Sequence, residues 1–381
     1  MKIFFTKTCF EQIQKSNLKV LSLGFFSLII ASFFLSCSSF HSSISGKHAS
    51  LNGNGIIRVQ EIPINNYDKI SIDNDFQYEY VYGVDTAFLT IEIDTNLMPY
   101  LDCYVKDRTL YIKIKKIEEE FGSTYKLSPS KCLISTGSPQ LLQVAQSGAS
   151  GFAIVNDFTG DSFELSKTGS SFFCFKKDVQ LRTLKMTQGG SGSMIVRGVC
   201  QAGNIELNRT GSGNIEFYNL IQGKKLDIIL SGSGGFLSDW DVNVDVLNLK
   251  QAGSGTSIFN GIVSAERFDI QKTGAGFVEC NGFLDIGDFN INRVGSGSVS
   301  LKKGEIKMSR ILSAGSGSIT GLGCSFWELE CNLAGSASIS ATVSQSVGYN
   351  ISGSGRLTVR GNPQVKFSTV TGSGGLILMK D

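Results

Sequence analysis

A short glycine-rich tetrad recurs through the last two thirds of the chain at an almost fixed spacing. It consists of a small residue, a glycine and two more small residues, and its first glycine occurs twelve times. Successive copies lie 21 residues apart seven times in a row, then 20, 20, 18 and 19. A constant period of this length predicts one short unit stacked on copies of itself, which is a solenoid. The first glycines are Gly148, Gly169, Gly190, Gly211, Gly232, Gly253, Gly274, Gly295, Gly315, Gly335, Gly353 and Gly372.

Apolar residues form columns when the copies are aligned on these glycines. In one copy they stand six and four positions before the glycine, as Leu184 and Met186 do, and four and six positions after it. A step of two is the period of a strand and not that of an amphipathic helix. A weaker third segment carries apolar residues such as Val179 and Ile221. Because each period returns the chain to the same place one layer on, neighbouring copies must run parallel.

The fold class predicted is therefore all-β: a single-stranded parallel β-helix, or β-solenoid, with coils of about 21 residues. Glycine is needed where the backbone takes a positive φ or where two backbones approach closely, so the tetrads are corners. Whether their glycines point inward or lie on a bend that resets the alternation stays open at this point.

Residues 1–37 carry the features of a bacterial secretion signal. Four lysines precede an apolar run from Val20 to Leu35, which is followed by Ser36 and Cys37. A positive flank, a short apolar stretch and a small residue before the cut are typical of such signals. A cysteine at the cut predicts a lipoprotein, in which Cys37 becomes the new N-terminus and carries lipid. The alternatives are an ordinary signal peptide and an N-terminal membrane anchor.

The rest of the chain divides by composition. Residues 38–55 are rich in Ser, Gly and Asn, which predicts a flexible tether. We expect the β-helix domain to cover 56–381, with regular coils over 141–381. Residues 56–140 alternate like strands but lack the strict period, so we expect irregular first coils that cap the open end of the solenoid.

Several short motifs resemble those of one bacterial family. They stand in the order Arg58-Val59, Tyr67–Ile70, Asn96–Tyr100 and Val105–Ile112, followed by the serial Gly-Ser-Gly copies. In this order they resemble the auto-transporter adhesin family with a head GIN domain, over about residues 56–381. The resemblance implies a β-helical envelope protein and offers no catalytic residues. Gly203-Asn204-Ile205 and Gly213-Asn214-Ile215 echo the motif behind the family's name.

Composition narrows the functional classes. The net charge is +2, with Lys and Arg dispersed, so no basic domain for nucleic acid is expected. Both histidines, His41 and His48, fall in the tether, which excludes a histidine base or metal ligand in the folded domain. We therefore expect no enzyme activity, no cofactor and no metal. Asp239, Asp241 and Asp245 are close in sequence, but a polar turn explains them better than an active site.

Nine cysteines are present, of which Cys9 lies in the signal and Cys37 is the lipidated one. The other seven form no C-x-x-C pair, so a disulfide framework or a zinc site is not expected. Cys280 and Cys331 occupy apolar columns and are expected to be packed thiols. A bridge between Cys324 and Cys331 stays open. The remaining four are Cys103, Cys132, Cys174 and Cys200.

One polar column is the candidate binding site. Two residues before the first glycine stand Gln146, Lys167, Gln188, Arg209, Leu230, Gln251, Lys272 and Arg293. Stacking would align four cations and three amides along one edge, which suits contact with an anionic polymer such as an acidic polysaccharide. The alternative is that these long side chains only decorate a corner and keep the solenoid soluble.

Together these features predict a non-enzymatic envelope lipoprotein that serves as an adhesin or a structural spacer. We expect a lipid anchor in the outer membrane, because Ser38 is not the Asp that usually retains lipoproteins in the inner membrane; which face it is displayed on stays open. The alternatives are a carbohydrate-active β-helical enzyme and a scaffold that oligomerises end to end. In the latter, the C-terminal edge near Leu376–Asp381 pairs with a second copy.

Overall fold

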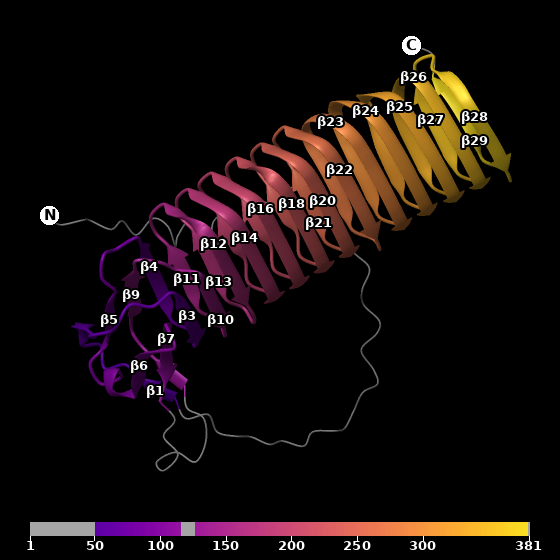
Figure 1. Ribbon diagram of the computed structural model, residues 1–381. Coiled ribbons are helices and arrows are strands. Elements are labelled where there is room, and N and C mark those ends of the chain that lie inside the picture. Colours follow the sequence, from indigo (N-terminus) through magenta and orange to yellow (C-terminus); the bar gives the residue numbers. More distant parts are fainter. Residues whose placement is uncertain (1–49, 116–125, 380–381) are drawn as a thin grey trace, which may run out of the picture. The chain divides into compact units, whose positions relative to one another are not determined.

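The computed structural model describes residues 50–115 and 126–379, which lie in one compact unit from His48 to Asp381. The predicted signal peptide, Cys37 and most of the tether lie outside the described residues. Strands dominate the fold, and its coils follow one another along a single axis (Figure 1). None of the helical residues described makes a segment long and apolar enough to span a bilayer.

Each coil of the solenoid has a short strand after the glycine corner and a long strand before the next one. The short strands are β11 (Gly151–Ile154), β13 (Phe172–Phe175), β15 (Met194–Val196), β17 (Ile215–Phe217), β19 (Phe236–Ser238) and β21 (Thr256–Phe259). The long strands are β10 (Gln143–Ser147), β12 (Phe158–Lys167), β14 (Val179–Gly190), β16 (Cys200–Gly211), β18 (Ile221–Gly232), β20 (Val242–Gly253) and β22 (Val263–Thr273).

Later coils lose the break between the two strands. Here a single strand runs through almost the whole coil, in β23 (Phe277–Gly295), β24 (Ser298–Gly315), β25 (Ser318–Gly335) and β26 (Ser338–Gly353). The chain then finishes with β27 (Arg356–Arg360), β28 (Gln364–Thr371) and β29 (Gly375–Met379). The third segment expected from the sequence is thus continuous with the strand before the glycine, and does not stand apart as a weaker element.

Pairing between coils confirms the predicted parallel β-solenoid. Leu184 lies opposite Ile205, Ile205 opposite Leu226 and Leu226 opposite Leu247, each one period apart. Equivalent side chains therefore stack on one another in the core, where the columns are buried. Phe152 and Phe173, for example, stack with ring centroids 5.7 Å apart and planes 5° from parallel.

The corner glycines resolve the question that the sequence left open. The first glycine of every tetrad has a positive φ, between 73° for Gly169 and 118° for Gly372, so the chain bends there. The next coil also leaves no room for a side chain: a Cβ on Gly232 would lie 2.5 Å from the Gly211 carbonyl oxygen. Both reasons for glycine thus apply at the same position.

The N-terminal region combines one coil of the solenoid with antiparallel strand pairs. Its strands are β1 (Ser50–Asn52), β2 (Ile57–Glu61), β3 (Lys69–Asp73), β4 (Gln77–Tyr82), β5 (Phe88–Asp94), β6 (Leu101–Lys106), β7 (Thr109–Ile114), β8 (Lys126–Ser128) and β9 (Cys132–Ser138), with one 3-10 turn, η1 (Met98–Tyr100). β3 and β4 pair in parallel with β10 and β11 and so form a first coil.

Beyond this first coil the pattern departs from the irregular coils expected. β2, β5 and β9 pair antiparallel, as do β6 and β7. Asp107 and Arg108 both have positive φ values, which fit the two-residue turn between β6 and β7. Because β7 and β9 pair with the outer edges of β3 and β4, they cover the N-terminal edge of the stack.

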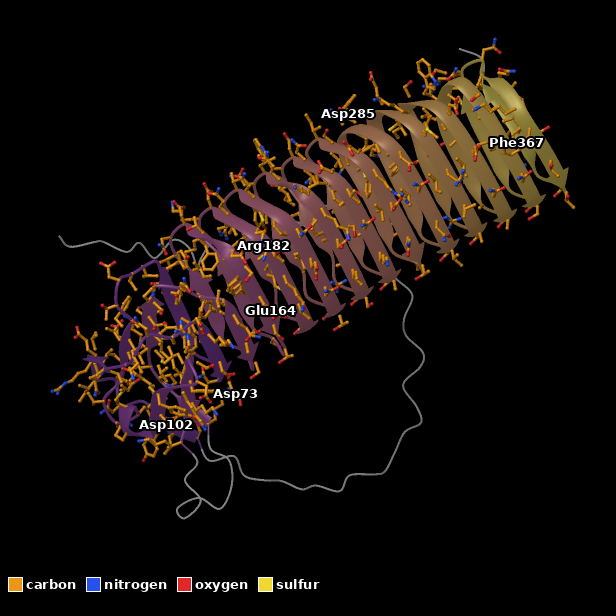
Figure 2. The ribbon with its side chains drawn as sticks, in the orientation of Figure 1. Asp73, Asp102, Glu164, Arg182, Asp285 and Phe367 are labelled. Carbon is orange, nitrogen blue, oxygen red and sulfur yellow. The ribbon has the colours of Figure 1, made fainter. Side chains whose placement is uncertain are left out.

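The C-terminal edge of the stack, formed by β28 and β29, is less covered than the N-terminal edge. β28 and β29 pair with β26 and β27 on one side, and within the described residues no strand pairs with their other side. Apolar side chains there, including Val365 and Phe367, are exposed (Figure 2). The pairing of this edge with a second copy stays a prediction.

Candidate functional site

The polar column predicted to contact a polymer lies inside the solenoid. Its six candidate side chains are at most 3% exposed. They are Lys167, Gln188, Arg209, Gln251, Lys272 and Arg293. The prediction of a surface strip is therefore wrong, and so is the alternative of a solvated corner. The reason is that positions two, four and six before the glycine lie on the same side of the strand, which faces the core.

Most side chains of this column donate hydrogen bonds to the backbone of the corner. Lys167 Nζ donates to the Ser171 carbonyl oxygen at 2.7 Å and Gln146 Nε2 to that of Ser150 at 2.9 Å. Arg293 Nη1 donates to the Gly297 oxygen at 3.0 Å. Gln188 and Gln251 make the same contact with Gly192 and Gly255. Each of these five side chains thus ties the strand before the glycine to the carbonyl two residues after that glycine.

Donor-rich side chains suit this position because their acceptors are carbonyl oxygens, which have two lone pairs. The Ser150 oxygen, for example, accepts both Gln146 Nε2 and the backbone N–H of Phe172 from the next coil. We refer to the buried residues at this position, from Gln146 to Arg293, as the corner ladder. Its members join the corner of one coil to that of the next, as Gln146 does with Ser150 and Phe172.

Arg209 shows that the corner ladder is shared between coils. The next coil has Leu230 at the equivalent position, which cannot donate a hydrogen bond. Arg209 Nη2 donates instead to the Gly234 oxygen of that coil, at 2.8 Å, while Nη1 donates to Gly211 in its own coil, at 2.6 Å. A Cβ on Gly234 would collide first with the Gly213 carbonyl oxygen of the preceding coil and then with the same guanidinium, so both explain the second glycine of that tetrad.

The electrostatics of the corner ladder follow from burial without counter-charges. Burial lowers the pKa of Lys167 to about 7. Burial also lowers the pKa of Arg209 and of Arg293. For Lys272, burial and then the charge of Arg293 in the next coil lower the pKa, and its Nζ has no hydrogen-bond partner among the described atoms. Lys167, Arg209 and Arg293 thus serve as donors inside the wall of the solenoid.

Two of the three aspartates singled out in the sequence make hydrogen bonds between turns. Asp239 Oδ1 accepts a hydrogen bond from Asn260 Nδ2 at 2.9 Å, and Asp241 Oδ1 accepts one from the Ile262 N–H at 2.8 Å. Asp245 is exposed on β20. The first two join turns of neighbouring coils, as expected of a polar turn. Across residues 50–115 and 126–379, no three acidic, histidine or cysteine side chains gather closely enough to hold a metal ion.

All seven cysteines of the described residues are free thiols. Cys280 and Cys331 are fully buried in the core columns, which confirms that they are packed thiols. No bridge joins Cys324 to Cys331. Burial raises the pKa of the Cys324 thiol to about 12, and it also raises the pKa of Cys331. Such thiols are not nucleophilic near neutral pH.

Two hollows on the outside of β23, β24 and β25 were missed at the sequence level. One has a volume of about 420 Å³ and is lined by charged residues such as Arg267, Asp288 and Glu330. The other, of about 400 Å³, is lined by Val294, Leu312 and their neighbours. The signal that could have found them is the set of outward columns one, three, five and seven positions before the glycine, which carry both apolar and charged residues here.

The architecture defines the class of protein: a single-stranded parallel β-solenoid with glycine corners and an internal ladder of donors. The family with the matching sequence model is described as "Putative auto-transporter adhesin, head GIN domain", and the model matches residues 66–244 and 238–363. The chain belongs to this family, as its motifs indicated. No curated protein matches the chain.

Crystal structures of bacterial proteins are similar to the chain at low identity. A "putative adhesin" from Parabacteroides merdae is 19% identical, over 87% of this chain and 99% of that one, with a TM-score of 0.37. A "putative adhesin" from Parabacteroides distasonis is 20% identical, over 87% and 100%, with a TM-score of 0.37. A "putative lipid binding protein" from the same species is 24% identical, over 87% and 99%, with a TM-score of 0.35.

A substitution of Arg209 tests the structural role of the corner ladder. Arg209→Leu removes the donors to the Gly211 and Gly234 carbonyls, and we expect the free energy of unfolding to fall by about 2–4 kcal/mol. Arg182→Leu is the matched control, because Arg182 is exposed on β14 and pairs with Asp161 in water (Figure 2). Chemical denaturation followed by circular dichroism measures both. If both substitutions lower the free energy of unfolding by the same small amount, the structural role of the corner ladder is contradicted.

The lowered pKa of Lys167 predicts a pH-dependent stability. Between pH 7 and the ordinary lysine pKa, the unfolded chain holds a proton on this group and the folded chain does not, so stability rises with pH. The rise is at most about 1.4 kcal/mol per pH unit. We expect wild type to gain stability from pH 7 to pH 9 relative to Lys167→Gln, which carries the residue of the neighbouring coils. Parallel pH profiles for the two proteins would contradict the burial of a neutral lysine.

Proposed function

We propose that this chain is a non-enzymatic lipoprotein of the bacterial envelope, anchored through Cys37 in the outer membrane, whose β-solenoid acts as an adhesin. Membership of the adhesin family supports the adhesive role. The positive flank, apolar run and cysteine of residues 1–37 support the lipid anchor. A lipid anchor at one end and a stack of coils beyond it suit a protein that presents a surface away from the membrane.

One structural observation supports adhesion most directly. The backbone of each regular coil pairs with both neighbouring coils, so the stack is held by continuous parallel ladders. Side chains that point outward are therefore fixed in columns at strand spacing, about 4.8 Å apart. A regular outer surface of this kind is already ordered before a ligand arrives, which lowers the entropy cost of binding.

A carbohydrate-active enzyme is the second candidate, and one observation favours it. The charged hollow holds three carboxylates, on Asp288, Glu328 and Glu330. An enzyme that uses such carboxylates on a polysaccharide would release new reducing ends. Incubation of the full chain with a panel of polysaccharides separates the two functions: the adhesin binds without release, and the enzyme cleaves.

Attachment of whole cells tests the proposal. Cells that express wild type should incorporate labelled fatty acid into the protein, lose it to added protease without permeabilisation, and attach to coated surfaces above the level of the empty vector. Cys37→Ser should abolish the label and the attachment together, because the protein is no longer held at the cell.

Cys103→Ser is the matched control, since this thiol lies in β6 of the folded domain and carries no predicted lipid. It should behave as wild type. Attachment that persists in Cys37→Ser cells, or protection of the wild-type protein from protease in intact cells, would contradict a lipid-anchored surface adhesin.

A further inference from the structure

The two hollows belong to a single surface. Alternation along the strand turns residues 288, 290, 292 and 294 of β23 outward, and residues 289, 291 and 293 between them inward. Pairing places the equivalent residues of β24 and β25 directly beside them, as in Asn292, Leu312 and Asn332. We call this set of outward residues on β23, β24 and β25 the outer grid.

One half of the outer grid is charged but close to neutral. Arg310 pairs with Glu330 at 3.3 Å, and Lys366 from β28 pairs with Glu328 at 2.8 Å. Asp288 has no hydrogen-bond or ion-pair partner within the described residues: Arg267 of β22 lies opposite it in the ladder but pairs with Asp269, at 2.8 Å. Most charges here are therefore paired and Asp288 is left over, so this half offers many hydrogen-bonding groups without a strong field of one sign.

The other half combines apolar side chains with amides. Val294 is 50% exposed and Leu312 39%, and two alanines continue the column of Val294 in the next coils. The amides of Asn292 and Asn332 flank Leu312 on both sides. Asn332 also accepts a hydrogen bond from Asn350 at 2.8 Å, which orients its amide. This half offers small apolar patches, each bordered by a donor and an acceptor.

Larger apolar side chains also lie in or next to the charged half of the outer grid. Met308 is 58% exposed and stands beside Arg310 in the same outward row of β24. Trp327 is 57% exposed and precedes Glu328, where the register of β25 shifts. An exposed indole next to ion-paired carboxylates is a surface on which a ligand with both an apolar face and hydroxyl groups can stack.

We propose that the outer grid binds an extended, uncharged carbohydrate. Sugars present C–H faces to apolar side chains and hydroxyl groups to amides, carboxylates and guanidinium groups, so they match both halves of the outer grid. A strongly anionic polymer is disfavoured, because it would meet the unpaired carboxylate of Asp288 and the two glutamates. The coil spacing of about 4.8 Å is close to the length of one sugar unit along a chain, so successive units can meet successive coils.

This inference rests on the proposed adhesive function and names the class of ligand that the adhesin recognises. The ligand-binding residues are now the outward residues of the outer grid, because the buried cations of the corner ladder cannot reach a polymer. Its neutral ligand also distinguishes it from the anionic polymer that the sequence suggested.

A glycan array probed with the detergent-solubilised full chain tests the proposal. We expect retention of uncharged oligosaccharides, with little change at high salt, because screening weakens only interactions between charges. Arg310→Gln and Leu312→Asn each remove one part of the outer grid, and each should weaken binding about tenfold. Leu312→Asn carries the residue of the two neighbouring coils and should fold normally.

Arg182→Gln is the matched control, because its ion pair with Asp161 has similar exposure but lies on an earlier coil. It should bind as wild type. Binding only of acidic glycans, no binding of any glycan by the wild type, or equal binding by all four proteins would each overturn the proposal. If cells still attach to protein-coated surfaces while the array stays empty, the adhesive function stands and the carbohydrate ligand falls.

Discussion

The structure depends on keeping each coil in register with the one before it. Strands one period apart pair in parallel through their backbones, and this register places equivalent residues of successive coils beside one another. The corner is where this is most difficult, since the chain bends at a positive φ with the neighbouring backbone in contact. Glycine meets both demands, and the corner ladder then fastens the bend through side-chain donors to its carbonyls.

This fastening explains an unusual choice of core residues. Lysine and arginine are rarely buried without a carboxylate partner, because their charge is costly to remove from water. Here their value lies in N–H donors on a long side chain: Arg209 reaches the carbonyls of two different coils. The lowered pKa of Lys167 means that the cost is reduced by releasing a proton near neutral pH.

The sequence was sufficient to predict the fold but not the position of its polar column. The period of 21 and the alternation of Leu184 and Met186 leave little freedom in the core, so the solenoid followed from them. Arg209 and Lys272 were assigned to the surface because of their charge. Their position in the repeat indicated burial instead, because it follows the alternation of the buried columns and is occupied by Leu230 in another coil. The antiparallel strands near the N-terminus have no period, and only the turn at Asp107 and Arg108 hints at them.

Register between coils is the central claim, and disulfide trapping tests it most directly. Lys185 and Glu206 lie opposite each other on β14 and β16, and Asp227 lies one coil further. Neighbouring parallel strands bring paired Cα atoms within the range that a disulfide spans, whereas two coils exceed it. After oxidation, a Lys185→Cys, Glu206→Cys protein should form the bridge, and a Lys185→Cys, Asp227→Cys protein should not. Bridging in the second protein but not in the first would contradict the stacking of coils at this period.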